Sequence, residues 1–312
     1  MSGTRIDVHT HYFGGSVSTL QTRPGTAPMR WNSQQALAFM DRQGIAAQLL
    51  SLPFTPVGTP YDPDFAVRFS RTVNREYADL ADHHPGRFGA FAALPGDCPE
   101  TMLAEIEYAL DTLGLDGVML SSNTRGHYLG APFLEPVLAE LNRRRTPVLI
   151  HPTGSPHVTE LALGRPPSVV EFPFDTARNI TNAIYTGVFQ RYPDLRLILP
   201  HCGGPLPALG QRIAEHTIVA MGPDDADIGP DHVAAVLRGL YYDTAMAGTR
   251  NCLLPALEVT SSDRILFGTD WPPAPESTVT RNTANLTGFG FTPDELFGIE
   301  RGNALQLFPR LR

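Results

Sequence analysis

Short apolar runs recur along the chain, and longer segments with helical periodicity lie between them. We expect a β-strand at each of eight runs: Ile6–Val8, Ala46–Leu52, Phe88–Leu94, Val118–Leu120, Val148–Ile150, Leu195–Leu199, Leu240–Tyr242 and Ile265–Phe267. The expected helices cover Ser33–Arg42, Tyr61–His84, Glu100–Leu113, Phe133–Arg144, Asp175–Arg191, Pro230–Leu237 and Leu253–Val259. Such an alternation is typical of parallel β-α-β units. The pattern therefore restricts the chain to an α/β fold with a parallel sheet.

Two parallel architectures satisfy this alternation: an open, doubly wound sheet and a closed (β/α)8 barrel. Eight strands in 312 residues favour the barrel. No Gly-x-Gly-x-x-Gly turn follows the first expected strand, which removes the main reason to expect a dinucleotide-binding sheet. We see no linker, low-complexity tract or internal repeat that would divide the chain. We therefore predict a single (β/α)8 barrel domain over residues 1–312.

The longest irregular segment, residues 152–173, is rich in proline, glycine and serine. It follows the fifth expected strand. Because long loops in compact domains are usually functional, we expect this segment to be an active-site loop.

Composition and charge limit the partners of the chain. A net charge of −8 and the lack of an extended basic cluster argue against nucleic acid as a partner. The one basic run, Arg143–Arg145, lies near an expected helix end, where it complements the helix dipole. No apolar stretch approaches membrane-span length, and the N-terminus lacks the hydrophobic region of a signal peptide. Three scattered cysteines, Cys98, Cys202 and Cys252, predict a reducing, cytoplasmic location.

Titratable side chains stand where four of the expected strands end. His9 and His11 close the first strand, and side chains at i and i+2 of a strand point to the same side. His151 follows the fifth strand, His201 the sixth and Asp270 the eighth. In a barrel these strand ends meet on one face, where active sites lie. Imidazole and carboxylate are ligands of zinc and manganese, so the pattern predicts a metal site.

Several longer motifs accompany these residues. They are Met40–Ile45, Leu149–Pro152, Gly187–Pro193, Pro200–Gly204, Gln211–Ile213, Phe267–Pro272 and Gly302–Leu305. Together with His9-Thr10-His11 they resemble the amidohydrolase superfamily over nearly the whole chain. The similarity is greatest to the branch containing α-amino-β-carboxymuconate-ε-semialdehyde, γ-resorcylate and 6-methylsalicylate decarboxylases.

The resemblance implies a role for each of these residues. His9, His11, His151 and Asp270 would hold one divalent ion, with zinc expected and manganese as the alternative. His201 would transfer protons beside the metal-bound water or the substrate. Met119-Leu120-Ser121-Ser122 stands where a carboxylated lysine would follow the fourth strand, so a mononuclear site is expected.

The resemblance also implies non-oxidative decarboxylation of a small aromatic or conjugated carboxylic acid. A divalent ion would orient the acid and stabilise the negative charge that develops. Either His201 or Asp270 would then handle the proton. The competing hypotheses are a hydrolase of a lactone or amide that uses a metal-bound water, and a non-enzymatic metal-binding barrel.

Four further residues are candidates for substrate binding. An arginine fork can bond both oxygens of a carboxylate, and Arg30 and Arg212 are the candidates. Arg30 could equally be a solvated loop residue, and Arg212 a helix-surface ion-pair partner. Phe174 and Trp271 suggest an aromatic pocket, although either could belong to the core. The resemblance implies that the arginine at the position of Arg212 reaches into the site of a neighbouring subunit. We therefore expect a homodimer or larger homo-oligomer.

Overall fold

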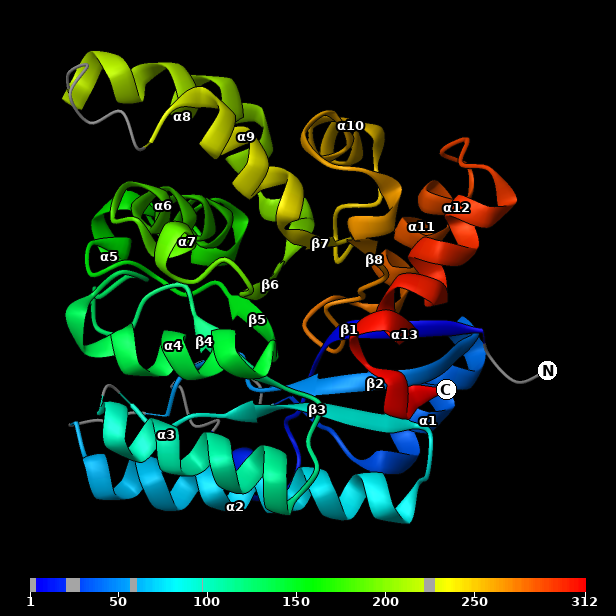
Figure 1. Ribbon diagram of the computed structural model, residues 1–312. Helices are drawn as coiled ribbons and strands as arrows, with labels where there is room; N and C mark the ends of the chain where they lie inside the picture. Colours follow the sequence, from blue (N-terminus) through cyan, green and yellow to red (C-terminus); the bar gives the residue numbers. More distant parts are fainter. Residues whose placement is uncertain (1–3, 21–28, 57–60, 97, 222–227) are drawn as a thin grey trace.

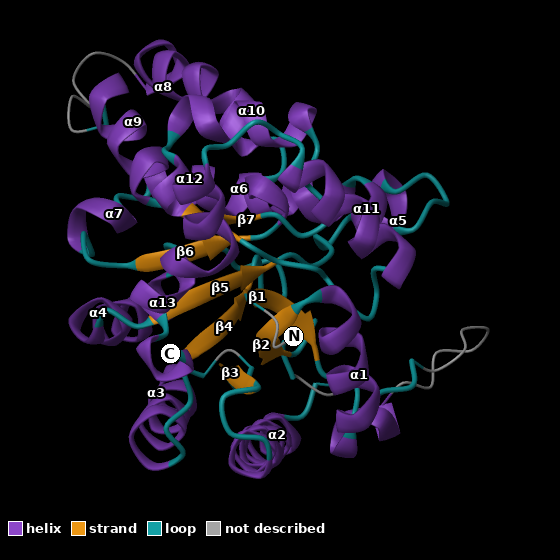
Figure 2. Ribbon diagram, turned by 90° about the vertical axis from the view of Figure 1, so that its right-hand side faces the viewer, coloured by secondary structure: helices purple, strands orange, loops and turns teal. Residues whose placement is uncertain are grey.

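The computed structural model describes residues 4–20, 29–56, 61–96, 98–221 and 228–312. Eight parallel strands form one sheet in chain order. They are β1 (Arg5–His11), β2 (Ile45–Ser51), β3 (Phe88–Ala93), β4 (Gly117–Ser121), β5 (Pro147–His151), β6 (Arg196–Leu199), β7 (Tyr241–Asp243) and β8 (Ile265–Leu266). Helices surround these strands (Figures 1 and 2), which confirms the (β/α)8 barrel.

The sheet closes where β1 meets the segment that follows β8. Val8 N donates to Phe267 O at 2.9 Å, and His11 N donates to Trp271 O at 2.8 Å. Between them, Asp270 N donates to His9 O at 2.8 Å. The pairing therefore continues well past the two residues of β8, along the chain to Trp271.

The helices are α1 (Ser33–Gln43), α2 (Pro63–His83), α3 (Pro99–Glu107), α4 (Glu135–Arg144), α5 (Val158–Leu161), α6 (Glu171–Tyr185), α7 (Val188–Arg191), α8 (Leu206–Met221), α9 (Pro230–Gly239), α10 (Arg250–Val259), α11 (Glu276–Thr287), α12 (Pro293–Phe297) and α13 (Asn303–Leu307). Local chemistry sets their ends. The side chain of Asn32 caps α1 by accepting from Gln35 N, and Gly44 ends that helix at a φ of 66°. No described helix is both long and apolar enough to cross a lipid bilayer.

Two expectations for the middle of the chain need correction. Residues 152–173 are not wholly irregular, because they contain α5, a short 3₁₀ turn and the start of α6. The helix expected over Asp175–Arg191 is two helices, α6 and α7, since Gly187 takes a φ of 70° and interrupts it.

A buried carboxylate ties two strands and the segment after β8 together inside the barrel. Asp7 of β1 is fully buried, and it accepts from Gln48 Nε2 of β2 at 3.0 Å. It also accepts from Thr269 Oγ1 at 2.7 Å and from Thr269 N at 3.0 Å. Burial raises the pKa of Asp7 to about 6, against the effect of these hydrogen bonds. Asp7 thus fixes the strand that carries His9 and His11 to the segment that carries Asp270.

Candidate metal centre

Three histidines converge at the carboxyl ends of β1 and β5. The Nε2 atoms of His9 and His11 lie 3.2 Å apart. The ring centre of His151 lies 5.5 Å from that of His9 and 4.7 Å from that of His11. One nitrogen from each ring lies within 4.8 Å of the other two, and all three residues are buried. The structure therefore brings the predicted imidazoles to one point.

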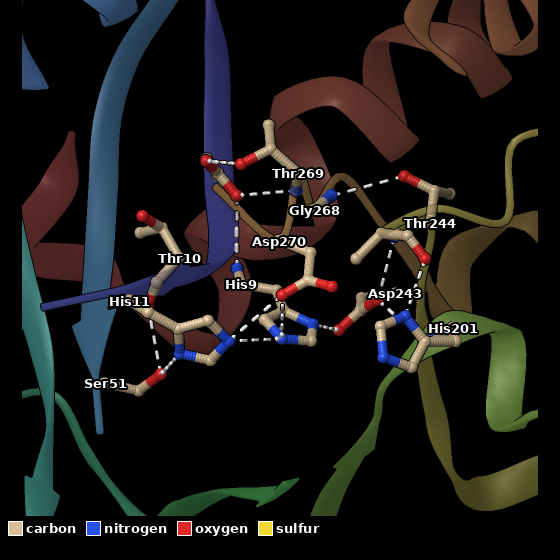
Figure 3. A network of polar contacts seen from close by, with 12 residues as sticks. His9, Thr10, His11, Ser51, His201, Asp243, Thr244, Gly268, Thr269 and Asp270 are labelled. Atoms are coloured by element: carbon tan, nitrogen blue, oxygen red, sulfur yellow. Dashed lines mark hydrogen bonds and ion pairs between the residues drawn. The ribbon is translucent and has the colours of Figure 1, made fainter. Parts of the chain in front are cut away.

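Asp270 approaches the same point from the segment after β8. Its Oδ1 lies 3.1 Å from His11 Nε2 and 3.6 Å from His9 Nε2 (Figure 3). Its backbone has a φ of 62°, in the left-handed region that non-glycine residues seldom adopt. Such strained residues cluster at functional sites, and here the strain accompanies a carboxylate beside two imidazoles.

Hydrogen bonds behind the rings set the tautomers of His9 and His11. His9 Nδ1 contacts Asp243 Oδ2 at 2.8 Å, so this nitrogen donates to the carboxylate. His11 Nδ1 lies 3.1 Å from Ser51 Oγ, and the hydroxyl of Ser51 donates to Thr10 O at 3.0 Å. The Ser51 oxygen is thus left to accept from His11 Nδ1. In their neutral forms both rings then present an Nε2 lone pair toward the centre, the arrangement that metal-binding histidines use.

This donor set fits one divalent ion. Three imidazoles and a carboxylate suit zinc, and manganese accepts the same ligand types. The buried Nδ1 of His151 has no hydrogen-bond partner among the described residues, a state that an ion or a solvent molecule would relieve. The chain contains no lysine at all, so a carboxylated lysine that bridges two ions cannot form.

A second group, His9, His201 and Asp243, is also close enough to hold an ion. Its ligand atoms already have other partners. Asp243 Oδ1 accepts from His201 N and Ala245 N, both at 2.9 Å, while its Oδ2 accepts from His9. His201 Nδ1 lies 2.8 Å from Ala245 O and therefore donates to that carbonyl. This group supports the first centre from outside.

His201 lies beside the centre without belonging to it. Its ring centre is 5.2 Å from that of His9, and the residue is only partly buried. Because Nδ1 donates to Ala245 O, Nε2 is the atom free to exchange a proton. Like Asp270, His201 has a positive φ, of 57°.

The charges of the centre follow from burial and from the two carboxylates. Burial opposes a charged His9, but Asp243 and Asp270 overcome it and raise its pKa to about 9. Burial lowers the pKa of His11 and, still further, that of His151. Burial raises the pKa of Asp270, yet the contact with His11 Nε2 and the positive charge of His9 hold this pKa below the usual range. One imidazolium between two carboxylates leaves the metal-free centre negative and attractive to a cation.

The four residues expected to contact the substrate occupy different surroundings. Trp271 stacks on Phe39 of α1, with ring centres 4.6 Å apart. Phe174, in the first turn of α6, is 48% exposed. Arg30 and Arg212 are exposed, and no contact among the described residues joins either to the histidines.

Sequence reasoning missed Asp243 and Ser51. Asp243 follows the apolar run Leu240–Tyr242 just as His201 follows its own strand, so its position carried the signal. Ser51 ends β2 beside His11, as the register of the two strands shows. A short polar residue at a strand end is too common to single out from sequence.

The chain is similar to known decarboxylases over almost its full length. The profile of the family described as "Amidohydrolase" matches residues 6–310. Decarboxylase yanB of Aspergillus niger is 32% identical to this chain, and the match covers 99% of this chain and 88% of the length of yanB. The 6-methylsalicylic acid decarboxylase of Penicillium expansum is 31% identical, over 99% of this chain and 97% of its own.

A solved structure has the same fold. It is a dihydroxybenzoic acid decarboxylase from Polaromonas sp. JS666 with bound manganese and the inhibitor 2-nitroresorcinol. The TM-score is 0.85 at 24% identity, over all of this chain and 98% of the other.

The charge of His9 gives a pH dependence to the stability of metal-free protein. A histidine whose pKa is raised on folding, here from 6.5 to about 9, stabilises the fold fully below pH 6.5, and this contribution is lost as the pH rises through about 9. Asp243→Asn removes the largest of the charges that raise the pKa of His9. Urea titrations with a chelator present should therefore show the free energy of unfolding of the wild type falling more steeply between pH 6.5 and 9 than that of the variant.

Asp116→Asn is a matched control, because Asp116 is a buried acid that pairs with Arg310 at the opposite end of the barrel. It should keep the wild-type slope. Equal slopes for wild type and Asp243→Asn would contradict the assignment of the His9 charge.

Proposed function

The chain belongs to the amidohydrolase family, and on that premise we propose that it is a metal-dependent decarboxylase of a small aromatic carboxylic acid of the hydroxybenzoate class. The observation that carries the proposal is the convergence of three buried imidazoles and Asp270 at the barrel's carboxyl end. The full-length similarity to the Penicillium 6-methylsalicylic acid decarboxylase supports the reaction class. It also favours a carboxy-lyase over a lactone or amide hydrolase.

We assign one divalent ion to His9, His11, His151 and Asp270. Bound there, the ion supplies a Lewis acid that stabilises negative charge on the substrate. The three imidazoles favour zinc. The manganese in the Polaromonas decarboxylase makes that ion the alternative.

The proton chemistry falls to His201. When the carbon–carbon bond breaks, carbon dioxide leaves and the electron pair stays on the ring carbon, which must then take up a proton. Asp270 is a poor donor because its lowered pKa keeps it ionised. His201 has its Nδ1 fixed on Ala245 O, so a protonated Nε2 is the donor directed at the substrate.

We further propose that residues 1–312 form a single barrel domain and that the protein is cytoplasmic. The three cysteines, all free thiols in the structure, support that compartment.

A direct assay tests the proposed reaction. Metal-loaded protein should release carbon dioxide from 6-methylsalicylate or a related hydroxybenzoate, with a matching change in ultraviolet absorbance. A chelator should stop the release, and zinc or manganese should restore it. Hydrolysis of lactones or amides without any release of carbon dioxide from these acids would reject the proposal.

His201→Ala should separate proton transfer from metal binding. We expect it to keep one ion per chain and to lose about 10²–10⁴-fold in kcat, the usual contribution of a positioned acid–base group. His151→Ala is the matched comparison, since it should lose the ion itself. Elemental analysis and carbon dioxide release measure both effects; wild-type turnover by metal-loaded His201→Ala would exclude the role.

We propose a homodimer in which Arg212 holds the substrate carboxylate of the neighbouring chain. Arg212 is exposed on α8, which Figure 1 shows lying beside α9 at the edge of the molecule. Arg212→Ala should then raise KM with the metal still bound. Hybrid dimers of Arg212→Ala and His201→Ala chains should regain activity, because one of their two sites is intact. Failure of verified hybrids to recover would confine Arg212 to its own chain.

A further inference from the structure

Helix α6 presents a stripe of polar side chains to the loop that follows β4, two of them buried and the third partly buried. Asp175, Asn179 and Asn182 stand at i, i+4 and i+7, which places them on one face of the helix. Asn179 Oδ1 accepts from Leu129 N at 2.8 Å, and Asn182 Nδ2 donates to Leu129 O at 2.6 Å. Both backbone polar groups of Leu129, in the β4–α4 loop, are thus held by α6.

Asp175 holds the near end of the same loop. It is fully buried, and its carboxylate accepts from four side chains. The donors are Ser122 Oγ at 2.5 Å, Asn123 Nδ2 at 2.8 Å, Tyr128 OH at 2.8 Å and Arg178 Nη1 at 2.9 Å. A buried carboxylate is tolerated when it is paired and fully hydrogen-bonded, and this one meets both conditions.

Ser122 passes this restraint on to the backbone at His151. Ser122 N donates to His151 O at 2.7 Å. Its Oγ donates to Asp175 and accepts from Thr153 N at 3.0 Å. Asn123 Nδ2, the second donor to Asp175, also donates to Gly154 O at 3.2 Å. The segment from His151 to Gly154 is therefore fixed by the two residues whose side chains Asp175 holds.

His151 depends on its backbone more than the other two histidines do. Asp243 orients the ring of His9, and Ser51 orients that of His11. Among the described residues, no hydrogen bond to either ring nitrogen orients His151 in this way. Where no side chain orients a ligand ring, the position of the main chain sets the direction of its nitrogen atoms.

The first turn of α6 also touches the loop that carries His201. Gly204, in that loop, has a φ of 59°, and a Cβ built on it would lie 2.7 Å from Pro173 O. Pro173 stands two residues before Asp175. One turn of one helix thus contacts both the loop of the proton-transfer residue and, through Ser122, the backbone of a proposed metal ligand.

We propose that Asp175 is a positioning residue of the metal centre, which acts through Ser122 and Asn123 to hold His151 in its binding orientation. This inference rests on the proposed function, because it takes the His151 site to be a metal site. No hydrogen bond among the described residues joins Asp175 directly to a proposed metal ligand. The role therefore predicts an effect on metal affinity that is separate from the stability of the fold.

Two variants and one control test this role. Asp175→Asn replaces one carboxylate oxygen, which accepts hydrogen bonds, with an NH₂ group, which donates them. That group would face some of the four side chains that now donate to Asp175. Ser122→Ala cuts the link to Thr153 and leaves the carboxylate three of its four donors. Asp116→Asn is the control: Asp116 is also a buried acid with an arginine partner and a backbone donor, Ala90 N, but it precedes β4 instead of following it. Loss at that end of a barrel affects stability rather than the site.

The measurements are zinc dissociation constants from competition with a chromophoric chelator and thermal unfolding of the metal-free proteins. We expect Asp175→Asn and Ser122→Ala to bind zinc about 10-fold or more weakly, as loss of an outer-shell partner does. Asp116→Asn should bind it as the wild type does, even where its unfolding temperature falls. If Asp175→Asn fails to fold, the zinc dissociation constant of Ser122→Ala tests the positioning role by itself.

Wild-type zinc affinity in folded Ser122→Ala, or an equal loss in Asp116→Asn, would overturn the positioning role and leave the proposed function standing. Wild-type protein that binds no divalent ion would overturn the proposed function, and this inference with it.

Discussion

The hydrogen bonds that close the barrel between β1 and the segment after β8 are the constraint on which the site depends. They join His9 to Asp270 and His11 to Trp271, residues about 260 positions apart in the chain. Without this closure, two imidazoles and the carboxylate beside them would lie on opposite edges of an open sheet. Asp7 reinforces the closure from inside, because it binds β2 and the β8 segment at once.

Burial then decides what the closed end can do. A carboxylate or an imidazolium without a partner is costly away from water, and each charge at this end has one. Asp243 accepts from a ring and two backbone amides, and Asp270 lies against two rings. The partners behind the rings also hold Nδ1 of His9 and His11, which leaves the inward nitrogens for a ligand. Orientation and charge therefore come from the same hydrogen bonds.

Much of this could be predicted from sequence, for physical reasons. The core strands are nearly continuous apolar runs, because helices cover a parallel barrel outside and side chains fill it inside. His9 and His11 are two residues apart in a strand, so their side chains point to the same side. The carboxyl ends of the strands of a barrel lie on one face, which brings the other site residues to these two. The bounds of α6 were harder to predict. Residues 171–174 carry no periodic signal, and Gly187 divides the helix expected over residues 175–191 into α6 and α7.

Tertiary contacts decided what the local pattern left open. Trp271 follows a strand end, yet its ring stacks on Phe39 of α1, a contact that no local pattern specifies. In the sequence Asp175 is an ordinary helix residue. Only the fold places Ser122 and Asn123 of the β4–α4 loop against its carboxylate. The place of Asp243 at a strand end could be seen in the sequence, but its contact with His9, like that of Ser51 with His11, joins strands distant in sequence and needed the fold.

Anomalous diffraction from metal-loaded crystals, recorded on both sides of the zinc or manganese absorption edge, tests the central claim most directly. The account predicts one peak per chain, bonded to nitrogen atoms of His9, His11 and His151 and to a carboxylate oxygen of Asp270, with His201 nearby but not bonded. A peak held by His201 and Asp243, or two peaks in one chain, would contradict it.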